Sequence, residues 1–291
     1  MPKAGIVTVV GKPNVGKSTL LNRIVGQKLS IVSPKPQSTR DRVVGIRSTA
    51  DSQMVILDTP GLLNPKYPLQ ESMRSTALRA LEDADVIVYV ADATEGTPPS
   101  LAEAAGLKQP PRGVIVTALN KSDRLASTAK SELEARDFSL VSALTGEGVP
   151  ELMARVEEQL PESPFLYPED EISTQPMRFF VAEMVRETVL EQLHDEVPYS
   201  VAVQVEEYRE ERSPLYIRAV IYIERDSQKA IIIGSKGAQI RRIGESARGK
   251  IEAFVGTQVY LDLWVKVLAN WRKNADSLSR FGYQLATGKS K

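Results

Sequence analysis

Residues 11–18 read GKPNVGKS and match the pattern G-x-x-x-x-G-K-[ST] of a loop that binds nucleotide phosphates. The apolar, β-branched run at residues 6–10 predicts a buried strand before the loop, and the apolar spacing of residues 19–25 predicts a helix after it. In that context the backbone N–H groups of the loop and the positive end of the helix would face phosphate oxygens. Lys17 would reach the β- and γ-phosphates, and the Ser18 hydroxyl would bind Mg²⁺.

The composition limits the chemistry that the chain can perform. Its 291 residues suggest two domains at about 150 residues each. The chain has no cysteine, which excludes disulfides, cysteine zinc sites and a thiol nucleophile and suits a reducing compartment. His194 is the only histidine, so histidine metal clusters are excluded as well. The formal net charge is zero, yet residues 229–291 hold 12 Lys+Arg against 4 Asp+Glu, and this basic end points to an anionic partner.

Two further segments would complete a phosphate and metal site. Residues 31–42 contain two prolines and no periodicity, which predicts a loop. Thr39 in this loop would close on Mg²⁺ and the γ-phosphate, unless the segment is an ordinary surface loop. The sequence DTPG at residues 58–61 favours the first interpretation, since Asp58 at the end of a strand would hold hydrated Mg²⁺ and Gly61 would bring its N–H close to the γ-phosphate. Loss of that phosphate would release the segment that follows, residues 62–72.

The base is predicted by residues 120–123, which read NKSD. Asp123 can accept hydrogen bonds from guanine N1–H and from the 2-amino group. Adenine has neither donor, so a site built on these bonds rejects it by roughly 10⁴-fold or more. We expect Asn120 to brace the surrounding loops, the stem of Lys121 to cover the base, and the backbone N–H of Ala143 to donate to guanine O6.

The order of these pieces resembles that of translation-factor-class and small GTP-binding proteins. The resemblance implies an α/β P-loop GTPase domain with a mixed, mostly parallel sheet at residues 1–162. Its strands are predicted at residues 6–10, 43–46, 53–57, 86–90, 113–119 and 138–141, with a closing helix at 148–160. The stretch at 124–141 is short for such a domain, so its helix is expected only over residues 128–135. The predicted nucleotide-binding residues are Gly11, Lys12, Pro13, Asn14, Val15, Gly16, Lys17, Ser18, Thr19, Asp58, Thr59, Pro60, Gly61, Asn120, Lys121, Asp123, Ser142, Ala143 and Leu144, and the metal ligands are Ser18, Thr39 and Asp58.

A second domain, residues 177–291, is predicted after a linker at residues 163–176, where prolines and acidic residues break every periodicity. Its predicted order is a helix, two strands, a helix, the turn G-x-x-G at 234–237, a helix and a strand. This order matches a smaller α+β KH domain of the second type, in which such a turn clamps about four nucleotides of RNA. The predicted RNA-binding residues are Gly234, Ser235, Lys236, Gly237 and Arg241.

The alternative for this second domain is a small α+β domain that binds nothing, and the local excess of positive charge argues against it. Trp264 and Trp271 follow the last predicted strand, residues 259–263. Both are expected to be packing residues rather than platforms for base stacking.

The segments GKPNVGKSTLLN, PQSTR, DTPG, NKSD, SALTGEG, PYSV, ERDSQKAIIIGSKG and LDLWVKV together resemble the bacterial Era family over nearly the whole chain. The resemblance implies a slow, Mg²⁺-dependent GTPase that binds GTP and GDP, binds the 3′ end of 16S ribosomal RNA and assists assembly of the 30S ribosomal subunit as a monomer. It also implies a cytoplasmic protein with peripheral contact to the inner face of the membrane. The sequence itself leads us to expect neither a signal peptide nor a membrane-spanning helix.

Two competing interpretations stay open beside a GTP-hydrolysing switch. One is an RNA-binding module whose nucleotide domain is structural and does not hydrolyse GTP, which the intact phosphate and metal residues argue against. The other is an ATP-dependent kinase or helicase-like enzyme, which the NKSD sequence argues against.

The hydrolysis step lacks one usual group. In many GTPases a glutamine after the D-x-x-G glycine orients the attacking water, but here that residue is Leu62. The sequence resembles GTPases with a hydrophobic residue at this place, in which a monovalent cation can help. Asn14 could hold K⁺ against the phosphates, or it could simply cap the loop. The candidates for a catalytic role are therefore Asn14, Thr39 and Gly61.

Overall fold

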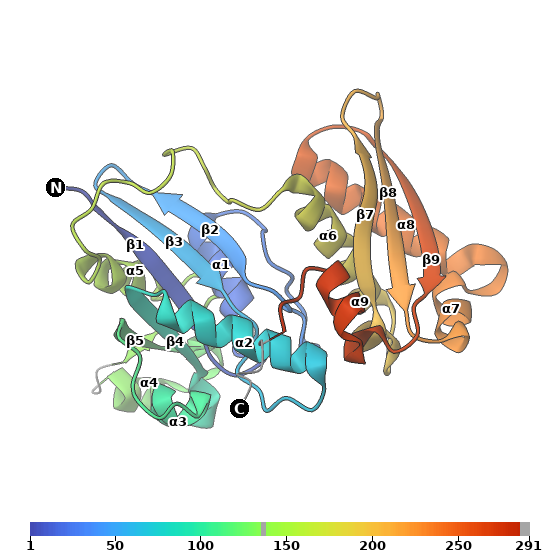
Figure 1. Ribbon diagram of the computed structural model, residues 1–291. Coiled ribbons are helices and arrows are strands. Elements are labelled where there is room, and N and C mark those ends of the chain that lie inside the picture. The colour runs from blue at the N-terminus through green and yellow to red at the C-terminus, as the bar shows by residue number, and fades with distance from the viewer. Residues whose placement is uncertain (135–137, 286–291) are drawn as a thin grey trace. The chain divides into compact units, whose positions relative to one another are not determined.

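The computed structural model describes residues 1–134 and 138–285, and the chain forms two compact units (Figure 1). The first unit comprises residues 1–66 and 70–174, and the second comprises residues 67–69 together with the chain from residue 175 onward. The division at 174 and 175 lies inside the segment that the sequence marks as a linker.

The first unit is built on a six-stranded sheet with the strand order β2-β3-β1-β4-β5-β6. Only β2 runs antiparallel to its neighbour, β3, and the other pairs are parallel, so the predicted mixed, mostly parallel sheet is confirmed. The predicted apolar strand at 86–90 lies in the middle of the sheet, between β1 and β5. The strands are β1 (Lys3–Val10), β2 (Val43–Ser48), β3 (Ser52–Asp58), β4 (Val86–Asp92), β5 (Val114–Asn120) and β6 (Ser139–Leu140).

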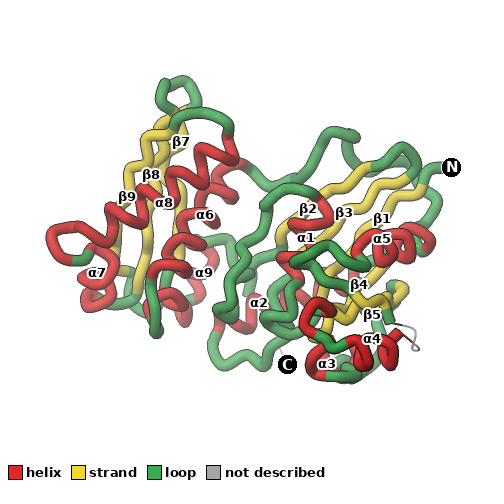
Figure 2. Tube along the Cα trace, turned by 180° about the vertical axis from the view of Figure 1, so that it is seen from behind, coloured by secondary structure: helices red, strands yellow, loops and turns green. Residues whose placement is uncertain are grey.

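Helices cover both faces of this sheet (Figure 2). They are α1 (Lys17–Val25), α2 (Pro68–Glu82), α3 (Leu101–Ala105), α4 (Ser127–Glu134) and α5 (Val149–Glu158). Side chains of β2 show the two faces: Val44 packs with Ala80 of α2, whereas a Cβ at Gly45 would lie 2.8 Å from Leu21 of α1. The short helix α4 agrees with the sequence prediction, although its predicted last residue, 135, lies outside the described residues. The helix α2 begins at Pro68, inside residues 62–72, and the release of that segment on loss of the γ-phosphate stays a prediction.

The predicted linker is attached to the first unit along most of its length. The buried side chain of Gln53 in β3 accepts hydrogen bonds from the backbone N–H groups of Leu166 and Tyr167, at 2.8 and 2.9 Å. Farther along, the N–H of Ile46 in β2 donates to the carbonyl of Ile172 at 2.9 Å. The segment from residue 163 to residue 174 therefore lies along β2 and β3 instead of forming a free tether.

The second unit contains a three-stranded sheet with the order β7-β8-β9, in which β7 and β8 are antiparallel and β8 and β9 are parallel. Its elements are α6 (Met177–Gln192), β7 (Ala202–Arg209), β8 (Leu215–Ile223), α7 (Asp226–Ile233), α8 (Ala238–Val255), β9 (Val259–Val267) and α9 (Ala275–Arg280). Helices α6 and α8 pack on one face of the sheet (Figure 2), and Ile217, Ala219 and Ile221 of β8 are fully buried. The order through β9 is the one predicted for a KH domain of the second type.

The two tryptophans of this unit have opposite environments. Trp271 is completely buried, its Nε1–H donates to the carbonyl of Ser200 at 2.7 Å, and its ring meets Phe281 edge to face. Trp264 is 53% exposed, so the prediction that it packs is wrong. The reason is strand alternation: the neighbouring Val265 faces the helices and is buried, which turns Trp264 to the other face of the edge strand β9.

We expect Trp271→Phe to lower the free energy of unfolding of the second unit by about 2 kcal/mol, because it removes a buried hydrogen bond and part of a buried ring. The matched control is Trp264→Phe, which should change that free energy by about 0.5 kcal/mol or less. Each variant keeps one tryptophan in this unit, so urea unfolding followed by tryptophan fluorescence measures both. Equal destabilisation by the two substitutions would contradict the assignment.

Candidate functional site

The phosphate loop connects the end of β1 to the start of α1 and has the backbone that its glycines allow. Gly16 has φ 97° and Asn14 has φ 63°, both in the left-handed region. A Cβ at Gly16 would lie 2.1 Å from Nδ2 of Asn120, which itself donates to the carbonyl of Val15 at 2.7 Å. Glycine is therefore required at this position by the close approach of the NKSD segment.

Lys17 is buried at the first turn of α1, and its ammonium donates to the carbonyl of Lys12 at 2.8 Å. Burial lowers the pKa of Lys17 to about 8, and the opposing attraction of Asp58 only partly offsets this. A polyphosphate beside the loop would favour the charged lysine again, because opposite charges attract strongly in a buried site.

Three side-chain oxygens converge beside Lys17. The Ser18 hydroxyl donates to Oδ2 of Asp58 at 2.7 Å and lies 2.8 Å from the hydroxyl of Thr39. Burial raises the pKa of Asp58, against the effect of Lys17 and of the hydrogen bond from Ser18. In the described part of the chain Oδ1 of Asp58 is buried with no hydrogen-bond partner. A hard, oxygen-binding cation such as Mg²⁺ fits this donor set, so the three predicted metal ligands lie together.

The DTPG segment passes directly against the phosphate loop. A Cβ at Gly61 would lie 2.7 Å from the backbone nitrogen of Pro13, so only glycine fits this approach. The N–H of Leu62 donates to the carbonyl of Gly11 at 2.9 Å. The Leu62 side chain is 5% exposed and packs with Val10 and Tyr89, so this residue offers no polar side-chain group to the loop.

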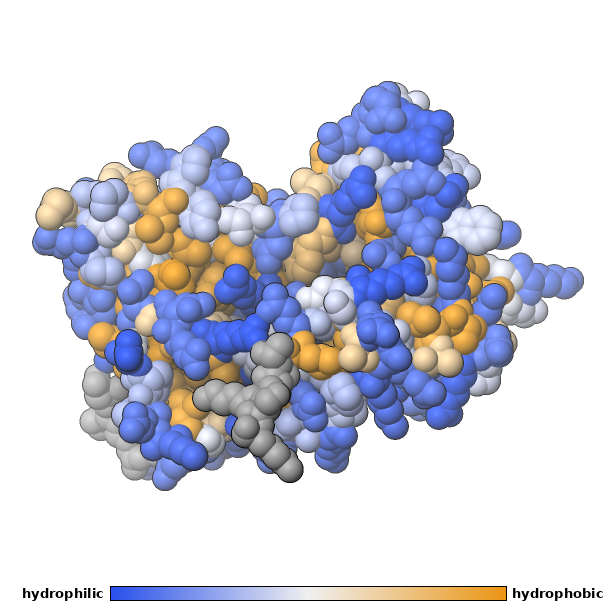
Figure 3. Space-filling view, viewed as in Figure 1, coloured by the Kyte–Doolittle hydropathy of each residue, from blue (hydrophilic) through white to orange (hydrophobic). Residues whose placement is uncertain are grey.

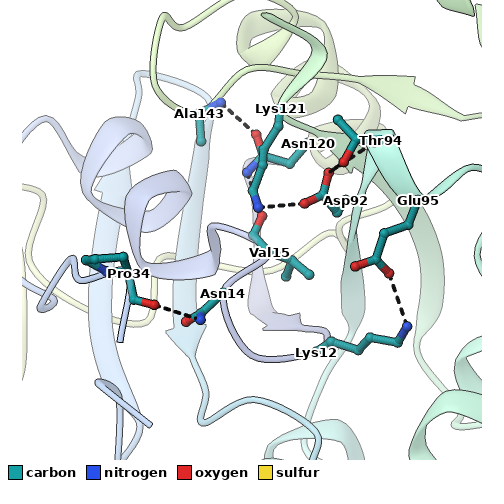
Figure 4. Close-up of polar contacts among 10 residues, drawn as sticks. All are labelled: Lys12, Asn14, Val15, Pro34, Asp92, Thr94, Glu95, Asn120, Lys121 and Ala143. Carbon is teal, nitrogen blue, oxygen red and sulfur yellow. Dashed lines mark hydrogen bonds and ion pairs between the residues drawn. The ribbon is translucent and has the colours of Figure 1, made fainter. Parts of the chain in front are cut away.

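The base-recognition residues meet at the other end of the site (Figure 4). Oδ1 of Asn120 accepts a hydrogen bond from the N–H of Ala143 at 2.8 Å, so this N–H, predicted to reach guanine O6, is engaged with Asn120 here. Asp123 accepts a hydrogen bond from the Ser142 hydroxyl at 2.6 Å. The side chain of Leu144 is largely exposed.

A cavity of about 370 Å³ brings together residues of the phosphate loop, the loop 31–42, the DTPG segment, the NKSD segment and residues 143–144. Residues of the predicted set that line it are Pro13, Asn14, Gly16, Lys17, Ser18, Thr19, Thr39, Gly61, Asn120, Lys121, Asp123, Ala143 and Leu144. Gly11, Val15, Asp58, Thr59, Pro60 and Ser142 do not line the cavity itself. The loop of residues 31–39 also borders it, through Ile31, Val32, Ser33, Pro34, Gln37 and Ser38, so the interpretation as an ordinary surface loop does not describe its position.

Lys12 is a predicted nucleotide-binding residue whose side chain lies elsewhere. Its ammonium pairs with Glu95 at 3.2 Å, and both side chains are more than half exposed (Figure 4). Sequence reasoning also missed two contacts in this view. The amide of Asn14 donates to the carbonyl of Pro34 at 2.9 Å, and the ammonium of Lys121 binds Asp92 at 2.6 Å. The sequence contains a signal for the second contact, because Asp92 comes just after a predicted strand and NKSD follows the next one.

The G-x-x-G turn of the second unit lies between α7 and α8. Gly234, Lys236 and Gly237 all have positive φ, at 69°, 49° and 78°. Ser235, Lys236 and Arg241 are exposed, so the turn presents its polar groups outward. The space-filling surface shows apolar residues gathered near α7 (Figure 3), and Ile231 of this helix is 49% exposed. An apolar surface beside an exposed glycine turn and a positive charge can accept both the bases and the phosphates of a single strand.

The helix α8, which follows the turn, packs against α6 and β9 through its inward face. Ile243, Ala247 and Ile251 are fully buried, as their helical spacing predicts. Ile240 and Phe254, which extend the same helical spacing toward the two ends of α8, are only partly buried.

Among the described residues, no group of three or more acidic, histidine or cysteine side chains could hold a metal, and no helix is long and apolar enough to cross a membrane.

Comparison with known proteins matches both units. A family model described as a 50S ribosome-binding GTPase matches residues 6–121, and a KH domain model matches residues 196–272. GTPase Era of Carboxydothermus hydrogenoformans is 42% identical over 295 residues, which cover 97% of this chain and 98% of that protein. GTPase Era of Thermotoga petrophila is 43% identical over 281 residues, with 93% and 94% covered.

Two solved structures resemble the whole chain. A crystal structure of an Aquifex aeolicus Era variant bound to GDP·AlF4⁻ has a TM-score of 0.91 at 39% identity and covers 97% of this chain and 100% of that one. A crystal structure of Era with MgGDPNP and nucleotides 1506–1542 of 16S ribosomal RNA has a TM-score of 0.91 at 39% identity and covers 98% of this chain and 100% of that one.

We expect Asp123→Asn to weaken GTP binding at least tenfold, about 1.4 kcal/mol, because it replaces one acceptor oxygen by a donor. The same variant should bind xanthosine triphosphate better than the wild type does, since the 2-oxo group of xanthine accepts a hydrogen bond. Equilibrium titration with both nucleotides measures the change. A GTP affinity within about threefold of wild type would contradict the role of Asp123.

Proposed function

Because the chain belongs to the family of GTPase Era, we propose that it is a GTP-hydrolysing switch that binds the 3′ end of 16S ribosomal RNA and assists assembly of the small, 30S ribosomal subunit. One observation carries this proposal: a single chain joins a cavity that holds the phosphate, metal and guanine motifs to a separate unit that exposes a G-x-x-G turn. The reaction is the conversion of GTP and water to GDP and phosphate.

The residues around Asp58 fit Mg²⁺, which supplies positive charge to β- and γ-phosphate oxygens when it is bound. Ser18 and Thr39 would hold it directly, and Asp58 would act through its buried, otherwise unpartnered Oδ1. Lys17 and the first turn of α1 would bind the phosphates from the opposite side. Catalysis then rests mainly on position and charge, as is usual for phosphoryl transfer.

The switch follows from the attachment of two loops to the same phosphate. Thr39 lies in the loop 31–42, and Gly61 begins the segment that leads into α2. Both lie against the phosphate loop, so both would respond to the presence of the γ-phosphate. The chain would thereby hold different conformations with GTP and with GDP.

We also propose that a monovalent cation assists the hydrolysis of GTP. The Leu62 side chain offers no polar atom to orient water, so another group must stabilise the charge that develops in the transition state. Asn14 borders the cavity and has an amide oxygen that is a suitable ligand for K⁺. Its Nδ2 donates to Pro34, so the amide also connects the phosphate loop to the loop 31–42.

In the second unit the G-x-x-G turn and its exposed Lys236 would grip the RNA backbone, and Arg241 would add positive charge on the first turns of α8. Crosslinking the protein to RNA in cells and sequencing the bound RNA tests this proposal directly. Recovery of the 3′ end of 16S ribosomal RNA supports it, and a random RNA sample would overturn it.

The second candidate, an RNA-binding module with a non-hydrolysing nucleotide domain, is opposed by the intact site around Lys17, Ser18 and Asp58. Undetectable GTP turnover with intact GTP binding would favour it. We further propose that the protein is a monomer in the cytoplasm with peripheral contact to the membrane, which the family resemblance and the cysteine-free composition support.

Replacing Ser235 and Lys236 by two aspartates should lower affinity for an RNA of nucleotides 1506–1542 by about 100-fold, because negative charge then stands where phosphate must lie. GTP affinity should not change. The control replaces the exposed Thr257 and Gln258, beyond the far end of the 18-residue helix α8, by aspartates. Unchanged RNA binding by the first variant would show that the second unit does not use this turn.

If K⁺ assists hydrolysis, GTP turnover should be about tenfold faster in potassium than in sodium chloride at equal ionic strength. Asn14→Ala should abolish this difference while GTP still binds. Single-turnover rates in the two salts, with GTP affinity measured in parallel, provide the test. Identical wild-type rates would remove the cation from the mechanism.

A further inference from the structure

Asp92 is an acidic residue that none of the nucleotide motifs includes. It ends β4 and pairs in register with Asn120 at the end of β5, so it stands beside the start of the NKSD segment. Its Oδ2 accepts a hydrogen bond from the ammonium of Lys121 at 2.6 Å (Figure 4). Its Oδ1 accepts from the N–H of Thr94 at 3.0 Å and from the Thr94 hydroxyl at 2.7 Å. Both carboxylate oxygens are therefore fixed.

Lys121 gains a defined position from this pair. Its backbone has φ 69°, in the left-handed region, and it lines the cavity next to Asn120 and Asp123. A lysine side chain is long and flexible, so its stem covers a base reliably only if the ammonium is held. Asp92 holds it from the side of β4, which leaves the carbon stem for the cavity.

The pair differs from an ordinary surface ion pair. The side chains of Lys121 and Asp92 are 24% and 12% exposed, whereas those of the nearby pair Lys12 and Glu95 are 55% and 61% exposed. Burial by itself would raise the pKa of Asp92, but the hydrogen bonds from Lys121 and Thr94 outweigh it and hold that pKa below its usual range. The carboxylate is thus charged at neutral pH.

We propose that Asp92 is a positioning residue of the guanine-nucleotide site, which acts by holding the ammonium of Lys121 so that the lysine stem lies across the plane of the base. The inference rests on the proposed binding of guanine nucleotides. Lys121 would contact the base, which GDP and GTP share, so the loss of Asp92 must weaken the binding of both nucleotides equally. The lysine stem would cover the plane of the ring and not the edge at which guanine and hypoxanthine differ. The preference for guanine over hypoxanthine must therefore stay unchanged.

A purely structural role for Asp92 has different consequences. Asp92 also caps the short turn Ala93–Glu95 through Thr94. If capping were its whole function, its loss would lower stability without acting through Lys121. Thr94→Val removes only the hydroxyl hydrogen bond to Oδ1 and keeps both the backbone N–H that Asp92 caps and the pair with Lys121, so it is the control for the contact with the Thr94 side chain.

The test is a double-mutant cycle with equilibrium binding of fluorescent GDP and GTP to the full chain. Asp92→Ala should weaken both nucleotides about tenfold, equivalent to about 1.4 kcal/mol. In a Lys121→Ala background the same substitution should cost nothing further. The ratio of GTP to inosine triphosphate affinity should remain that of the wild type, in contrast to Asp123→Asn. Glu95→Gln, a matched removal of negative charge nearby, should leave affinity within about twofold.

The sign of the effect separates positioning from general electrostatics. Removal of a negative charge near a polyanion would by itself increase the affinity for the nucleotide, whereas a positioning role for Asp92 requires that this affinity decrease. Wild-type affinity in Asp92→Ala, or the same loss with and without Lys121, would overturn the inference. Asp92→Asn, which keeps the size of the side chain, provides the same comparison if the alanine variant folds poorly. Failure of the wild type itself to bind GTP would overturn the proposed function and this inference with it.

Discussion

The nucleotide site depends on one amide side chain, that of Asn120. Its Nδ2 donates to the carbonyl of Val15 in the phosphate loop, and its Oδ1 accepts from the N–H of Ala143 in the base loop. A single planar group thus fixes the distance between the loop for phosphates and the loop for the base. The same approach excludes any side chain at Gly16, so one hydrogen-bonded bridge determines both the geometry and a part of the sequence.

The nucleotide site holds buried charged groups, and their burial costs free energy. Burial disfavours the charged forms of both Lys17 and Asp58, as the direction of each pKa shift shows. A polyphosphate with its divalent cation supplies opposite charges to both groups. Binding must therefore stabilise the folded first unit as well as occupy the cavity, because a ligand that prefers the folded state shifts the unfolding equilibrium.

Much of this architecture could be predicted from sequence, because parallel strands place their carboxyl ends along one edge and the motifs follow strand ends. The phosphate loop, Asp58, the NKSD segment and the order of the second unit are of this kind. Contacts between side chains distant in sequence could not be predicted. Asp92 with Lys121, and Lys12 with Glu95, depend on loop conformations that periodicity does not encode. The exposure of Trp264 depends on which face of an edge strand stays uncovered.

The proline-rich segment before the second unit also affects the tendency of copies of the protein to aggregate. A strand at the border of a sheet exposes unpaired N–H and C=O groups, to which another chain can add. At one border of the six-stranded sheet, Ile172 accepts from β2 and the Ser173 hydroxyl donates to the carbonyl of Val44. At the other border, β6 has only two residues. The first unit therefore offers little template for edge-to-edge aggregation, and a chain cut before residue 172 would expose one.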